Sequence, residues 1–175
     1  GNGSGAVDGT SSGSGSGAGG EGNGRTALTK VGTGTFTLSG TSTYTGATAV
    51  NAGILTINGN QSAATGAVTV ASAATLKGTG TIGGATTIQT GGLMNAGAHS
   101  DNSPTVTAPV GKQTFSSDLT LNSQSIFSWD LSGEKDTSNG TRGTDYDAVD
   151  VGGNLSAFTA GGTPTPASDA IFRVI

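Results

Sequence analysis

The residues of this chain whose types and spacing could do chemistry are carboxylates in its C-terminal part. Asp145, Asp147 and Asp150 lie close together in sequence, and carboxylate oxygens are the ligands that Ca²⁺ prefers. In a strand, Asp145 and Asp147 would share one outward face while Tyr146 and Ala148 take the other, which is the simpler interpretation. No G-G-x-G-x-D calcium repeat occurs. These three residues are weak calcium candidates, and no other cofactor is expected.

Catalytic chemistry finds little support in the sequence. Two carboxylates could serve as the acid and nucleophile of a glycosidase, but such sites add aromatic subsites, and the one Trp and two Tyr are far apart in sequence. The single histidine, His99, lies beside Ser100 and Asp101, yet neighbours in a turn rarely reach the geometry of a triad. A G-x-G-x-x-G spelling at 78–83 is followed by no helical pattern. We expect no enzymatic activity.

Threonine pairs could form a different kind of site, a flat ladder that orders water as ice-binding proteins do. T-x-T occurs at 33–37, 41–45, 79–81, 105–107 and 163–165. A solenoid ladder would repeat once per coil, but these intervals are irregular. Thr is also a common strand residue of small bulk, so the pairs are interpreted as ordinary strand positions.

The composition excludes several classes of protein and indicates how the elements are built. Gly, Thr and Ser supply 82 of the 175 residues, the net charge is −4, and there is no Cys. Nucleic acid is not an expected partner, because only seven basic residues are present and they are scattered. No apolar run approaches the roughly 20 residues of a membrane helix. Gly and Thr are poor helix formers, so the chain is predicted to be all-β.

A six-residue spacing in the centre of the chain predicts the architecture. The large apolar residues there are Val70, Leu76, Ile82, Ile88 and Met94, and almost everything between them is small or polar. A β-sandwich would bury two or three apolar residues per strand. One large residue per six fits a β-solenoid, in which each short strand sends one or two side chains into a narrow core.

The chain divides into two parts and a loop. Residues 1–24 contain 11 Gly and 5 Ser and are predicted to be a flexible arm, since they cannot bury enough surface to offset backbone entropy. Residues 25–175 are predicted to form the β-helix domain. Within it, the polar stretch 132–144 is expected to protrude as a loop.

The motif at 28–57 resembles a known repeat. The segments 28–40, 44–48 and 51–55 follow the pattern L-x-K-x-G-x-G-x-x-x-L-x-G, Y-x-G-x-T and G-x-L of the autotransporter-associated β-strand repeat, also called the passenger-associated transport repeat. Segments 78–84 and 146–151 resemble the sequence that commonly follows it. The resemblance implies a right-handed parallel β-helix in a secreted or surface-exposed bacterial protein, and it carries no catalytic residues. With one full copy, the chain is either a fragment or a small subunit.

These observations lead to one main hypothesis for function. The chain is expected to be a non-catalytic extracellular or cell-surface structural subunit that assembles head to tail into a filament or layer, because a solenoid has open strand edges at both ends. Strand addition is the expected mode. The expected self-association residues are Ala27, Leu28, Val31, Ile171, Phe172, Val174 and Ile175.

An alternative hypothesis gives the chain a binding role. It would be the rigid stalk of an adhesin passenger, in which the 132–144 loop, with Trp129 and Tyr146 nearby in sequence, contacts a glycan or a host protein.

Overall fold

Every element of the structure is a β-strand. The structure is a computed structural model that describes residues 4–8, 13–14, 26–97, 110–129, 140–141, 143–157 and 171–174. The strands are β1 (Ser4–Asp8), β2 (Gly13–Ser14), β3 (Ala27–Val31), β4 (Thr35–Leu38), β5 (Thr48–Val50), β6 (Gly53–Ile57), β7 (Asn60–Gln61), β8 (Val68–Val70), β9 (Ala74–Gly78), β10 (Thr81–Ile82), β11 (Thr86–Ile88), β12 (Leu93–Ala96), β13 (Lys112–Phe115), β14 (Leu119–Leu121), β15 (Ile126–Trp129), β16 (Ala148–Val151), β17 (Leu155–Ala157) and β18 (Ile171–Val174). The predicted all-β class is confirmed.

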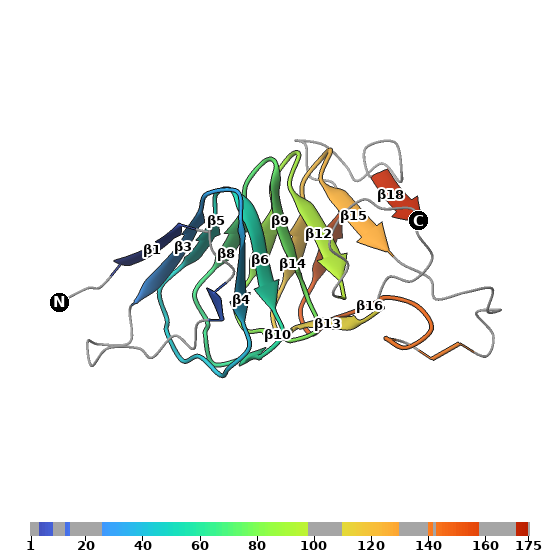
Figure 1. The fold of residues 1–175 in the computed structure, drawn as a ribbon. Helices are drawn as coiled ribbons and strands as arrows, with labels where there is room; N and C mark the ends of the chain where they lie inside the picture. The colour runs from blue at the N-terminus through green and yellow to red at the C-terminus, as the bar shows by residue number, and fades with distance from the viewer. Residues whose placement is uncertain are drawn as a thin grey trace.

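The strands stack into three sheets that run along one axis (Figure 1). Sheet A has the order β1-β3-β5-β8-β11-β14-β17, sheet B the order β18-β15-β12-β9-β6-β4-β2, and sheet C the order β16-β13-β10-β7. All pairings between these strands are parallel. From β6 onward, successive strands visit sheets B, C and A in turn. This is the predicted parallel β-solenoid.

The six-residue spacing is one third of a coil. Val70 in β8 pairs with Ile88 in β11, eighteen residues later, and Leu76 in β9 pairs with Met94 in β12 at the same interval. Ile82 lies between them on the third side, in β10. One large residue per side of a three-sided, eighteen-residue coil therefore gives the observed period.

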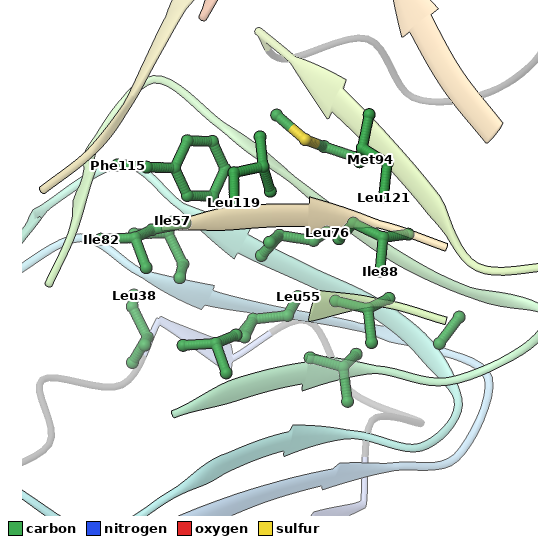
Figure 2. Packing of buried hydrophobic residues seen from close by; sticks show 14 residues of the cluster. Leu38, Leu55, Ile57, Leu76, Ile82, Ile88, Met94, Phe115, Leu119 and Leu121 are labelled. Carbon is green, nitrogen blue, oxygen red and sulfur yellow. The ribbon is translucent and has the colours of Figure 1, made fainter. Parts of the chain in front are cut away.

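The core is a thin column of aliphatic side chains enclosed by the three sheets, as Figure 2 shows for Leu55, Leu76, Ile82 and their neighbours. In sheet B, Leu55, Leu76 and Met94 follow one another in register, and each is at most 1% exposed. Because each coil needs only a few such residues, the low apolar content of the sequence is compatible with a continuous core.

The N-terminal segment differs from its prediction as a separate arm. β1 and β2 lie within residues 1–24 and pair with β3 and β4, so these two strands extend the stack. Parallel hydrogen bonding uses the backbone, and an open sheet edge pairs with a strand whatever its side-chain bulk. Ala27, Leu28 and Val31 are consequently not at a free edge, contrary to expectation, because β3 pairs with β1 on one side and β5 on the other.

Other sequence-based predictions fall at or beyond the limits of the described residues. The apolar strand β18 pairs with β15 of the same chain, so its covering comes at least in part from the chain's own coils; Ile175 lies outside the described residues. His99, Ser100 and Asp101 also lie outside them, as does most of the predicted 132–144 loop.

Candidate functional site: the repeat motif and the C-terminal coil

Lys30, the lysine of the repeat motif, is a fully buried cation. It pairs in register with Val50 of the next coil, at a position of sheet A that carries Val70 and Ile88 further along. Its Nζ donates hydrogen bonds to the carbonyl oxygens of Val31 at 2.7 Å, Gly32 at 2.8 Å and Ala52 at 3.1 Å. Burying an ammonium group is costly unless its protons are bonded. The three carbonyls meet that need and join two successive coils.

The glycines of the motif surround this ammonium. Gly53 has a left-handed φ of 68°. A Cβ at Gly53 would lie 2.6 Å from the Gly34 carbonyl oxygen and 2.8 Å from the Lys30 Nζ, and closer still to the Gly32 carbonyl oxygen. The K-x-G-x-G and G-x-L parts of the motif, which are separated in sequence, are therefore one contact between coils.

The Y-x-G-x-T part of the motif forms the return to sheet A. The Tyr44 hydroxyl and Thr48 Oγ1 lie 2.7 Å apart and share a hydrogen bond. Burial raises the pKa of Tyr44, and the bond to Thr48 opposes that rise. A Cβ at Gly46 would lie 2.5 Å from the backbone oxygen of Thr26, so only glycine allows the coils to approach here.

The L-x-G part closes the corner after sheet B. Leu38 is buried in the core, and the carbonyl oxygen of Gly40 accepts a hydrogen bond from Gln61 Nε2 of the next coil at 2.6 Å. Each motif residue thus fixes a turn or the spacing between coils. The motif explains stacking, and it presents no nucleophile or general base.

The three calcium candidates have separate partners. Asp145 Oδ2 accepts a bond from the Thr141 backbone N–H at 2.8 Å, and Asp150 forms an ion pair of 3.1 Å with Lys112. Asp147 Oδ1 accepts a bond from the backbone N–H of Gly111 at 2.8 Å. Across the described residues, no three His, Cys, Asp or Glu side chains are grouped so that they could hold a metal ion. The calcium hypothesis stays a prediction.

The expected outward position of Asp147 is wrong. Asp147 is 1% exposed, and β16 begins only after it, at Ala148. The carboxylate is buried because it caps the backbone of the neighbouring coil, where the unpaired N–H of Gly111 needs an acceptor.

Two aromatic residues far apart in sequence meet in the C-terminal coil. The rings of Trp129 and Tyr146 are tilted by 44° with centroids 5.8 Å apart, and Trp129 Nε1 donates to the carbonyl oxygen of Asp147 at 2.5 Å. Both side chains are partly exposed. Sequence reasoning missed this pair because β15 and the turn before β16 are brought together only by the course of the coil.

The structure also arranges hydroxyl side chains in one column on sheet A. Thr69, Thr87, Thr120 and Ser156 are consecutive register partners, one per coil. Thr69 lies between the buried Val68 and Val70 and is itself only half-buried, so this column is on the outer face of the sheet. The T-x-T intervals could not reveal it, because it uses single threonines from coils of unequal length.

The three-sided stack and its purely structural motif define a β-solenoid repeat protein. Residues 28–57 match the family model of the passenger-associated-transport-repeat, which confirms the resemblance inferred from the motif. Neither curated proteins nor solved structures give a match. None of the described residues belongs to a helix that is long and apolar enough to cross a membrane.

Proposed function

We propose that this chain is a non-catalytic structural segment of an extracellular or cell-surface protein, and that its β-helix associates head to tail into a filament or layer. The passenger-type repeat at 28–57 supports the location. The roles of the motif residues support a structural rather than a chemical task, since Lys30, Tyr44 and Gln61 bond only to the chain itself in the contacts described above.

One observation carries the proposal of association. Among the described strands, each sheet ends on strands that have a neighbour on one side only, namely β1 and β17 in sheet A, β2 and β18 in sheet B, and β7 and β16 in sheet C. An unpaired strand edge is a template for further pairing. When the two ends of one molecule differ, their contact is heterologous and need not close into a ring.

Electron microscopy and sedimentation of the purified chain test this proposal. We expect polymers that grow with concentration. Leu155→Asp, which places a charge at the end of a core column, should abolish them, whereas Ser156→Asp, in the outward column, should leave them intact. Discrete monomers of the unaltered chain at every concentration would refute head-to-tail association.

A second candidate function is favoured by the Trp129–Tyr146 pair. Paired, partly exposed aromatic rings are suited to stacking against the apolar faces of sugar rings, as expected for an adhesin stalk that binds a glycan. Asp145 and the Lys112–Asp150 pair occur in the same coil and could supply polar contacts.

Glycan arrays with and without Ca²⁺ test the second candidate. Binding should be lost in Tyr146→Leu, which removes one ring of the pair, and kept in Tyr44→Phe, which alters the repeat motif instead. Silence of the unaltered chain on the arrays, with polymers on the grid, would eliminate the glycan hypothesis and retain the first one.

A further inference from the structure

The last described strand of sheet A carries a leucine in a core column. Thr48, Val68, Thr86, Leu119 and Leu155 are consecutive register partners in β5, β8, β11, β14 and β17. The first four are 1–4% exposed, whereas Leu155 is 59% exposed and is the one large hydrophobic side chain among the described residues that is so exposed. Leu155 therefore occupies a position that every preceding coil buries.

The opposite edge of the stack carries small residues at the equivalent register positions. Gly5 of β1 pairs with Leu28, which pairs with Thr48, so Gly5 and Leu155 belong to the same column. In sheet B, Gly13 of β2 pairs with Phe36. Two core columns thus begin with a glycine at the β1 and β2 edge.

The same two columns end with large residues. The column of Gly5 ends at Leu155, and the column of Gly13 continues through Leu55, Leu76 and Met94 to Phe127 and finally Phe172 of β18. A third column reverses the order, since it begins with Val7 beside Lys30 and ends with Ala157 beside Leu121.

We infer that the joint between two copies of this chain has a defined register, with β17 of one copy pairing with β1 of the next and β18 pairing with β2. This inference rests on the head-to-tail association proposed above. It places Leu155 against Gly5, Ala157 against Val7 and Phe172 against Gly13, so each of the three columns receives one large and one small residue.

A second copy fits this end better than an unrelated partner for a physical reason. Tightly packed interiors tolerate neither voids nor excess volume, and the chain itself supplies the complementary sizes in all three columns and in two sheets. A slip of one residue would turn Leu155 to the outer face of the sheet. A slip of two would set Leu155 against Val7 or leave it without a partner. Only one register matches all the positions.

An exchange of residues across the joint tests the register. Gly5→Leu puts two leucines in one column and Leu155→Gly leaves two glycines, so each variant should raise the concentration at which half of the chain is polymerised by about tenfold or more. The double variant restores one large and one small residue, and should polymerise within about threefold of the unaltered chain. As a matched control, Ala6→Leu and Ser156→Gly change the neighbouring outward column and should have little effect.

Separate outcomes distinguish the register from the association itself. If the unaltered chain polymerises but the double variant is as weak as the two single effects combined, the register is wrong and head-to-tail association stands. If the unaltered chain stays monomeric, both fail. Trp129 fluorescence and the urea midpoint report whether each variant is folded. If Gly5→Leu does not fold, Gly13→Leu and Phe172→Gly make the same exchange in sheet B, and failure of that double variant to recover polymerisation would overturn the register equally.

Discussion

Replacing Gly53 with alanine is the sharpest test of how the repeat motif holds two coils together. Gly53 has a φ of 68°, which costs an L-residue about 1 kcal/mol. The new Cβ would also lie 2.6 Å from the Gly34 carbonyl oxygen and 2.8 Å from the Lys30 Nζ. Neither group can move away easily, because one is backbone and the other is bonded to three carbonyls.

The magnitude follows from these contacts. Overpacking in a tight interior costs about 1–3 kcal/mol, and weakening a hydrogen bond of a buried charge costs about 1.5–3 kcal/mol. Together with the cost of the left-handed backbone, Gly53→Ala should destabilise the fold by about 3–5 kcal/mol. With an m-value of about 2 kcal/mol per molar urea, the unfolding midpoint should fall by about 2 M.

Gly91 provides the matched control. It has a similar φ of 75°, but its Cβ would crowd only the Oγ of Ser72, an atom that can rotate away. Gly91→Ala should therefore lose only about 1 kcal/mol, or about 0.5 M in urea midpoint measured by far-UV circular dichroism. Equal midpoints for the two variants would show that the contact between Gly53, Gly34 and Lys30 does not limit stability.

Three further predictions concern single side chains. Lys30→Met should destabilise the fold by about 3 kcal/mol in urea unfolding, because it removes the donor to three carbonyls; Lys112→Met should change stability by less than about 1 kcal/mol, since that ion pair is largely exposed, and a similar loss in both variants would contradict the role of Lys30. Ala73→Gly should raise the thermal midpoint, because Ala73 has a φ of 61°, whereas Ala67→Gly in the approach to β8 should lower it; a fall in both would show that Ala73 is not strained. Because burial raises the pKa of Tyr44, its contribution to stability should be complete below about pH 10 and be lost as the pH rises through the folded-state pKa. Tyr44→Phe should remove that alkaline loss and Tyr146→Phe should not, as measured by unfolding free energies between about pH 8 and 11.

The sequence by itself determined the fold class and the regular part of the stack. The spacing from Val70 to Met94 predicted a narrow solenoid core, and all five of those residues are buried at 1% exposure or less. The motif residues at 28–57 predicted the family. Both signals are readable because each side of a short coil needs one apolar residue at a fixed interval, and each tight turn needs glycine.

The tertiary structure decided everything that depends on which coil lies beside which. Ile88 pairs with Leu121 thirty-three residues later, and Leu121 with Ala157 thirty-six residues later, so sequence intervals no longer report the register there. The burial of Asp147, the Trp129–Tyr146 pair and the hydroxyl column of sheet A all follow from these unequal coils. The same holds at the N-terminal edge, where backbone pairing adds β1 and β2 to the stack although their composition predicts an arm. Parallel pairing joins distant segments through backbone groups that every residue carries, and side-chain patterns alone therefore do not specify it.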